Sequence, residues 1–185
     1  MPSSASSASR SSCTRRERPD VVPPTTIRAL AAADWDDVRR IYADGIATKN
    51  ATFETEVPPA AVLDAQWLPG QRWVATIDGA VAGWAAVSPT SRRECYRGVG
   101  ETSVYVDAQH GGRGIGAALV RHQVAAADEG GLWTLQTSIF SENRASLTIH
   151  RAAGFREVGR RERIAQLAGA WRDTILLERR APEPS

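Results

Sequence analysis

Apolar residues along the chain follow two spacings that alternate in a regular order. An apolar residue at every third or fourth position predicts a helix, and apolar residues at alternate positions or in short runs predict strands. Helices are predicted over residues 34–47, 59–68, 114–129 and 143–153. Strands are predicted over residues 26–30, 72–77, 80–87, 99–106, 132–139, 155–165 and 171–179. The predicted order, β-α-α-β-β-β-α-β-α-β-β, is that of an α/β protein.

Cap and turn residues support several of these boundaries. Asp34 is a predicted N-cap for the first helix, and Asp78-Gly79 predicts a hairpin between the second and third strands. Gly154 follows the last helix, where a left-handed residue commonly ends a helix. The cap and turn residues therefore lie at the element boundaries that the apolar spacing predicts.

The two ends of the chain lack this periodicity. Residues 1–24 are rich in Ser, Arg and Pro, so they are predicted to form a disordered tail, and residues 181–185 are predicted to fray. The tail also resembles an organellar transit peptide, although prolines, Glu17 and Asp20 interrupt any amphipathic helix. Residues 25–180 are predicted to form a single domain, which suits a chain of 185 residues.

Charge and cysteine content narrow the functional classes. The chain has 23 Lys and Arg against 21 Asp and Glu, so no basic excess indicates a nucleic-acid partner. No apolar run approaches the roughly 20 residues that span a bilayer. The 2 cysteines predict neither a disulfide framework nor a metal site. We therefore expect a cytoplasmic protein with no metal and no membrane or nucleic-acid partner.

Residues 104–120 carry an alternating strand into a glycine-rich turn and then into a helix. Such glycines can take positive φ and leave no Cβ in the way, so that consecutive N–H groups converge on one anion. The first-turn amides and the dipole of the following helix suit a pyrophosphate, and Arg113 adds a cation. The glycines concerned are Gly111, Gly112, Gly114 and Gly116.

Two common phosphate loops do not fit this turn. Gly116 is followed by Ala117-Ala118, where a P-loop requires Lys and then Ser or Thr. The next strand, 132–139, does not end in the acidic residue of a dinucleotide-binding unit. A glycine-rich turn that binds nothing remains the alternative for this pattern alone.

Two ordered motifs resemble the GNAT N-acetyltransferases. Val104-Tyr-Val106 with Gly114-Ile-Gly116 is similar to their acetyl-CoA loop, and the segment from Asn143 to Phe155 is similar to their second signature. Phe53-Glu-Thr-Glu56, Glu101-Thr-Ser-Val-Tyr-Val106 and Ile149-His150 resemble the phosphinothricin and methionine sulfoximine acetyltransferase branch. The resemblance covers residues 26–179.

The resemblance implies a fold and a cofactor. The fold is an α/β GNAT fold, with a mixed, mostly antiparallel central sheet that is splayed between its fourth and fifth strands and flanked by about four helices. Acetyl-CoA would lie in the splay as co-substrate, and a homodimer is implied as well. The residues implied in cofactor binding are Val104, Tyr105, Val106, Gly111, Gly112, Arg113, Gly114, Ile115, Gly116, Ala117, Asn143 and Ser146.

Some of these residues have a second interpretation. Asn143 and Ser146 begin a predicted helix, where their side chains could instead cap first-turn amides. Val104 and Val106 would bond the pantetheine chain through their backbone, while their side chains could simply be core. Gly111 stands where the family usually has Gln or Arg, so phosphate affinity would depend more on Arg113 and on backbone amides.

The resemblance implies two catalytic residues. Glu101 begins the strand that leads to the glycine loop, and apolar neighbours there could raise its pKa into the range of a general base. His150 stands where many superfamily members have a tyrosine that protonates the leaving thiolate. The alternatives are a structural or exposed carboxylate for Glu101 and an ordinary packed helix histidine for His150.

The resemblance to this branch also implies substrate-binding residues. Arg93 and Tyr96 match positions that hold the carboxylate, phosphinate or sulfoximine group of an amino-acid analogue, and Phe53 would line the same pocket. Ser91 replaces a basic residue that is frequent in the branch. A solvated loop is the alternative for Arg93, and core packing is the alternative for Phe53.

The function predicted is acetyl transfer from acetyl-CoA to the amine of a small amino-acid-like substrate: phosphinothricin, methionine sulfoximine or methionine sulfone. One alternative is a GNAT enzyme for an amino sugar, a polyamine or a protein amine. Another is an acyl-CoA-binding regulatory module without turnover.

Overall fold

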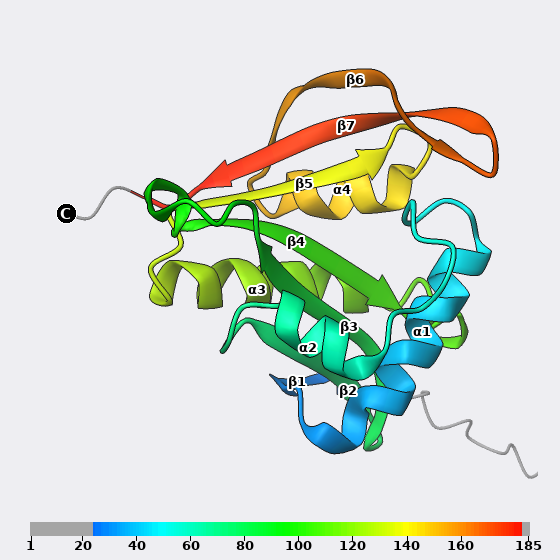
Figure 1. Ribbon diagram of the computed structural model, residues 1–185. Coiled ribbons are helices and arrows are strands. Elements are labelled where there is room, and N and C mark those ends of the chain that lie inside the picture. Colours follow the sequence, from blue (N-terminus) through cyan, green and yellow to red (C-terminus); the bar gives the residue numbers. More distant parts are fainter. Residues whose placement is uncertain (1–23, 183–185) are drawn as a thin grey trace, which may run out of the picture.

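The computed structural model describes residues 24–182 and contains one seven-stranded sheet (Figure 1). The predicted disordered tail and frayed C-terminus lie outside the described residues, except for residues 24, 181 and 182. The strands are β1 (Thr26–Ala29), β2 (Arg72–Ile77), β3 (Ala80–Pro89), β4 (Val99–Val106), β5 (Thr134–Phe140), β6 (Arg156–Leu167) and β7 (Ala170–Arg180). Their order across the sheet is β1-β2-β3-β4-β5-β7-β6.

Helices cover both faces of the sheet (Figure 1). They are α1 (Trp35–Ala47), α2 (Ala60–Gln66), α3 (Ile115–Glu129) and α4 (Arg144–Ala152). Apolar residues of α1 and α2 pack with Trp84 on one face, and those of α3 and α4 pack with Leu135 and Ile139 on the other. The predicted order of elements is confirmed.

Asp34 has a different role from the one predicted. It precedes α1, but its side chain makes no cap hydrogen bond to that helix. Instead the buried carboxylate accepts bonds from the Arg28 guanidinium at 2.6 and 2.8 Å and from the Ala31 amide at 2.7 Å. A short 3-10 turn over Ala32–Asp34 moves the carboxylate back toward β1. The prediction placed the boundary well but missed this competing partner.

The sheet divides between β4 and β5. Every pairing is antiparallel except that of β4 with β5, which is parallel and short. β4 pairs with β3 from Gly100 to Val106, whereas its pairing with β5 ends at Glu101 opposite Gln136. Beyond this point the two strands separate, so the predicted splay between the fourth and fifth strands is confirmed.

In the part of the chain that the structure describes, no helix is both long and apolar enough to cross a membrane. The same residues contain no group of three or more His, Cys, Asp or Glu side chains placed to hold a metal ion.

Candidate active site

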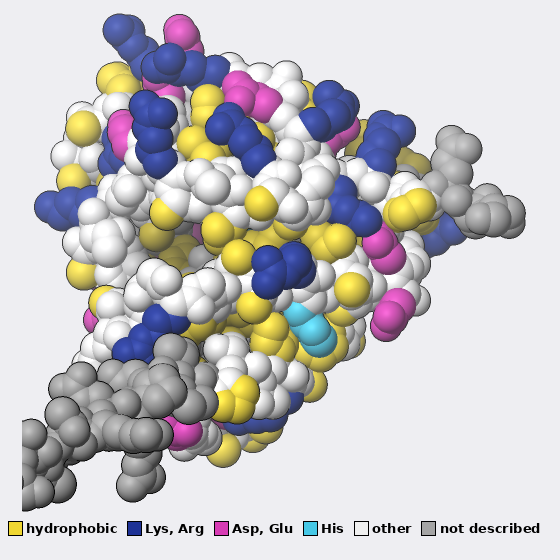
Figure 2. Space-filling view, turned by 180° about the vertical axis from the view of Figure 1, so that it is seen from behind, with side chains coloured by type: hydrophobic (Ala, Val, Ile, Leu, Met, Phe, Trp, Pro, Cys, Tyr) yellow, Lys and Arg dark blue, Asp and Glu magenta, His cyan; other side chains and the backbone are white. Residues whose placement is uncertain are grey.

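A cleft of about 680 Å³ occupies the splay between β4 and β5. Figure 2, which views the molecule from behind, shows a hollow between its two halves, with apolar side chains in and around it. The lining comes from five segments: the loop 51–54, β4 from 101 to 106, the glycine loop with the start of α3, β5 from 137 to 140, and α4 with its cap. Segments that are far apart in sequence therefore meet at one opening.

The backbone of β4 turns unpaired groups toward this cleft. The Asp107 amide donates to the Ala82 carbonyl of β3 at 2.9 Å, and the Thr134 amide of β5 donates to the Gly98 carbonyl at 3.1 Å. Because backbone groups alternate in direction along a strand, the N–H and C=O of Val104 and Val106 face the β5 side, where pairing has already ended. They can bond an amide-bearing chain such as pantetheine.

Only some glycines of the loop adopt a backbone conformation that requires glycine. Gly112 and Gly114 have φ of 75° and 78°, a region that side chains other than glycine rarely adopt. Gly111 has a φ of −57°, so the prediction of positive φ is wrong there. Gly116 lies inside α3, and a Cβ there would come within 3.2 Å of Ile149 and 3.4 Å of Val106. Gly116 therefore permits close packing rather than a turn.

The first turn of α3 faces the same cleft. Gly114 is its N-cap and offers no side-chain cap, and Ile115, Gly116 and Ala117 line the opening. The first amides of a helix have no intrahelical partner and stand at the positive end of its dipole. The loop and the helix together can bind an anion such as a pyrophosphate.

Asp107 anchors the start of this loop. Its buried carboxylate accepts a bond from Arg40 of α1 at 2.7 Å and one from the Gln109 amide at 2.8 Å. Burial alone would raise the pKa of Asp107, but these donors outweigh it and hold the pKa below its ordinary value. The loop is thereby fixed to α1 by an ionised group.

Asn143 is held at the opposite wall by two partners. Its Oδ1 accepts from the Ser146 amide at 3.1 Å, which confirms the predicted N-cap. Its Nδ2 donates to the Asn50 carbonyl at 2.9 Å, which ties α4 to the loop after α1. Both residues 143 and 146 line the cleft. One amide hydrogen of Asn143 is left for a ligand.

His150 lines the cleft from α4 and is only 2% exposed. Its Nδ1 lies 2.8 Å from the Ser146 carbonyl oxygen, so Nδ1 carries a proton. Burial lowers the pKa of the imidazole, and the carbonyl only partly opposes this. The neutral ring then presents an unprotonated Nε2, which has no hydrogen-bond partner among the described residues. Nε2 must first gain a proton before it can act as an acid.

Glu101 lies where the splay begins and lines the cleft. Its side chain shares a face of β4 with that of Tyr105, which packs on Trp84 and Tyr42. This is the α1 and α2 face, whereas Val104 and Val106 pack against the α3 side. The carboxylate and the anion-binding loop therefore approach the cleft from opposite faces of the sheet.

Tyr105 contributes differently from its valine neighbours. Its ring stacks on Trp84 with 4.5 Å between centroids, and burial raises the pKa of its phenol. Its backbone faces β3, opposite Trp84 in the register. Tyr105 therefore lines the cleft with a ring and has no backbone group directed into the splay.

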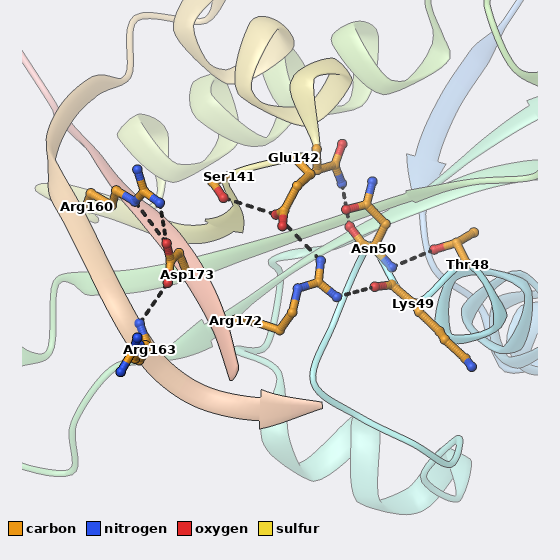
Figure 3. Close-up of polar contacts among 10 residues, drawn as sticks. Thr48, Lys49, Asn50, Ser141, Glu142, Arg160, Arg163, Arg172 and Asp173 are labelled. Atoms are coloured by element: carbon orange, nitrogen blue, oxygen red, sulfur yellow. Dashed lines mark hydrogen bonds and ion pairs between the residues drawn. The ribbon is translucent and has the colours of Figure 1, made fainter. Parts of the chain in front are cut away.

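The loop before α2 closes the cleft on the Glu101 side. The ring of Phe53 meets that of Phe140 edge to face at 4.7 Å. The Arg172 guanidinium of β7 lies over the ring of Phe140, 4.2 Å from its centroid. Arg172 also donates to the Lys49 carbonyl at 2.8 Å (Figure 3). Its other nitrogen is 3.5 Å from Glu142. Arg172 thus contacts both Lys49, where the loop begins, and Phe140, the residue that Phe53 packs against.

Three predicted residues do not line the cleft. Arg93 and Tyr96 are exposed and pack on each other, with the guanidinium carbon 5.7 Å from the ring centroid. Arg113 is exposed on the glycine loop. None of the three is among the cleft residues, whereas Phe53, Glu101, His150 and the remaining predicted residues are.

Several lining residues were not predicted from the sequence, and two of them, Glu54 and Ser138, bring polar groups that bear on the acceptor. Glu54 adds a second carboxylate to the cleft, and Ser138 adds a hydroxyl from β5. Glu54 stands beside Phe53 in a motif that was already recognised. Ser138 lies on the same face of β5 as Phe140, a placement that only the register of the sheet reveals.

Comparison with known proteins agrees with this geometry. Residues 35–155 match the model of the acetyltransferase (GNAT) family. The chain is 34% identical over 191 residues to a phosphinothricin N-acetyltransferase of Alcaligenes faecalis, an alignment that covers 97% of this chain and 94% of the relative. It is 31% identical over 159 residues to an L-methionine sulfoximine/L-methionine sulfone acetyltransferase of Pseudomonas paraeruginosa, covering 83% and 92%.

A solved structure shares the same architecture. A GNAT superfamily phosphinothricin acetyltransferase from Sinorhizobium meliloti, crystallised with acetyl-CoA, superposes with a TM-score of 0.79 at 28% identity. The superposition covers 86% of this chain and 89% of that one.

Proposed function

Because the chain belongs to the GNAT family of acetyltransferases, we propose that it transfers an acetyl group from acetyl-CoA to the amine of a small amino-acid-like substrate. Phosphinothricin, methionine sulfoximine and methionine sulfone are the candidate acceptors, in agreement with the names of the relatives. The observation that carries the proposal is the end of the β4–β5 pairing at Glu101, which puts a carboxylate at the apex of the cleft.

The cofactor residues fit acetyl-CoA. The glycine loop and the first amides of α3 suit the pyrophosphate. The outward groups of Val104 and Val106, with one amide hydrogen of Asn143, suit the pantetheine chain. Acetyl-CoA bound there would supply the thioester from which the acetyl group is transferred.

In the proposed reaction Glu101 takes a proton from the acceptor ammonium. The amine lone pair then attacks the thioester carbonyl, and the carbon–sulfur bond breaks with its electron pair leaving on sulfur. A donor amide of β4 stabilises the oxyanion. The nitrogen loses a second proton on becoming an amide, and this proton balances the one that the thiolate gains. His150 can deliver it to sulfur only after its Nε2 has accepted it. Glu54 adds negative charge on the acceptor side, which favours an ammonium over a neutral amine.

The test is thiol release from acetyl-CoA with five amines: methionine sulfoximine, methionine sulfone, phosphinothricin, an aminoglycoside and spermidine. We expect turnover of the amino-acid analogues alone, and its loss in Glu101→Gln. Turnover of only the aminoglycoside or spermidine would contradict the acceptor class. Binding of CoA without any turnover would support a regulatory module instead.

A cytoplasmic location, a homodimeric assembly and protection against phosphinothricin-like compounds belong to the same proposal. Protection is measured as growth of a sensitive bacterial host on phosphinothricin with the wild-type chain or with Glu101→Gln.

A further inference from the structure

The strand β6 carries a partly buried arginine that no carboxylate of the described residues pairs with. Arg156, Arg160, Arg172 and Arg179 of β6 and β7 each lie within 4.0 Å of a carboxylate. Arg161 has no such partner among residues 24–182, although it is only partly exposed and its Nε is buried without a hydrogen bond. An unpaired, partly desolvated guanidinium is costly unless a ligand completes it.

Arg161 reaches the wall of the cleft. It pairs with Thr174 of β7, and its Nη2 extends across that strand to donate to the Ser138 hydroxyl of β5. Ser138 lines the cleft, whereas Arg161 does not and reaches the cleft wall only through Ser138. Because the Ser138 oxygen accepts from Arg161, its own hydrogen is available to donate into the cleft.

The backbone around Arg161 holds it in place. Between Arg161 and Ala165 the register shifts, so that three residues of β6 oppose Asp173 alone. The Asp173 carboxylate accepts from the Arg163 amide at 2.8 Å and from the Arg160 Nε at 3.0 Å, one on each side of Arg161 (Figure 3). Asp173 does not line the cleft; it fixes the bulge that carries Arg161.

We propose that Ser138 binds the carboxylate of the acceptor amino acid and that Arg161, which donates to Ser138, supplies the positive charge beside it. This assignment rests on the acetyl transfer proposed above and gives Arg161 the role that the sequence suggested for Arg93. Ser138 is two residues along β5 from Gln136, the partner of Glu101. Strand rise and spacing then separate Glu101 and Ser138 by roughly 8 Å. An α-amino acid spans such a gap, with its ammonium at Glu101 and its carboxylate at Ser138, the partner of Arg161.

Charge supports the same orientation. Glu54 and Glu101 lie on the acceptor side of the cleft and would repel a carboxylate while attracting the ammonium. Arg161 supplies a positive charge next to Ser138 at the β5 wall, which favours a carboxylate there. A zwitterion therefore has one orientation in which both of its charges are matched.

Calorimetric binding of methionine sulfone and of its carboxamide to CoA-saturated protein tests the assignment. The carboxamide keeps the amine but removes the negative charge. We expect the wild-type protein to bind the acid roughly 10- to 100-fold more tightly than the carboxamide, as hydrogen bonds to charged groups contribute in proteins. Arg161→Leu should reduce this ratio to about 1, and Arg161→Lys should restore part of it.

Arg163→Leu is the matched control, since it removes a neighbouring arginine that does not contact the cleft wall. The inference is wrong if Arg161→Leu keeps the wild-type ratio, if it weakens both ligands equally, if Arg163→Leu has the same effect, or if the acid does not bind. If Arg161→Leu fails to fold, Ser138→Ala decides: it should weaken binding of the acid alone, by several-fold. A preserved binding ratio without thiol release would refute the proposed reaction and leave the carboxylate site standing.

Discussion

The two halves of the cleft are built from different chemical groups. The half proposed to bind the cofactor, the cofactor half, uses backbone: the amides of the glycine loop, the start of α3 and the outward groups of Val104 and Val106. The half proposed to bind the acceptor, the acceptor half, uses side chains: Glu101 and Glu54, the ring of Phe53, and Ser138 with its partner Arg161. Backbone suits a cofactor shared by many enzymes, and side chains can change the acceptor without moving the fold.

The largest effect should come from the residue at the apex. Glu101→Gln keeps the shape of the side chain but removes its ability to take a proton. We expect kcat to fall roughly 10²- to 10⁴-fold, the range that general-base catalysis contributes, with CoA affinity unchanged. The rate is measured as release of the CoA thiol over time. Glu56→Gln, an exposed carboxylate outside the cleft, is the control, and an equal loss there would remove the special role of Glu101.

The second-largest effect should come from a substitution that changes the backbone of the cofactor half. Gly114→Ala forces a side chain into a φ of 78°, which costs about 1–2 kcal/mol. We expect the KM for acetyl-CoA to rise roughly tenfold while the KM for the acceptor stays the same. Gly111 has a φ of −57°, which alanine adopts freely, so Gly111→Ala should behave as wild type. Equal effects of the two substitutions would show that the loop geometry is not what binds the cofactor.

A smaller effect is expected where the acceptor loop is held. Arg172→Leu removes the bond to Lys49, the pairing with Glu142 and the contact with Phe140. Loss of about 1 kcal/mol of anchoring should raise the KM for methionine sulfone by roughly fivefold without changing that for acetyl-CoA. Arg97→Leu, which removes a similar contact with the Trp133 ring, is the control. A rise in both KM values would mean that Arg172 supports the fold generally.

The smallest effect concerns stability and pH at His150. Its pKa is lowered by burial in the folded protein, while the unfolded chain titrates near 6.5. As pH falls below about 6.5, the unfolded state takes up a proton that the folded state resists, so the free energy of unfolding decreases, by at most about 1.4 kcal/mol per pH unit. Urea unfolding at pH 7.5 and 5.5 should show a smaller decrease for His150→Gln than for the wild-type protein. Equal pH slopes would contradict a neutral buried imidazole.

Local signals explain why much of the fold and the cofactor half could be predicted. Periodicity gave the order of the elements, glycines marked the loop, and Asn143 lies at the N-cap position where caps are expected. The motif placed Glu101 on β4, and only the structure shows that pairing with β5 ends there. These features depend on residues that are close in sequence or on motifs with fixed spacing.

The acceptor half could be predicted less well because it depends on distant partners. In sequence the arginines of β6 look alike, and the partly buried one without a carboxylate is recognised only when burial and the partners are known: Asp173 for Arg160 and Glu178 for Arg156. Arg93 matched a motif, yet its loop lies outside the cleft lining. Asp34 was misassigned for a related reason, since Arg28 competes for its carboxylate.

The most direct test of this division is steady-state kinetics in which acetyl-CoA and methionine sulfone are both varied, for Gly114→Ala and Arg161→Leu. We expect Gly114→Ala to raise the KM for acetyl-CoA alone and Arg161→Leu to raise the KM for methionine sulfone alone. If each substitution raises both KM values by the same factor, the two halves of the cleft are not separate binding sites.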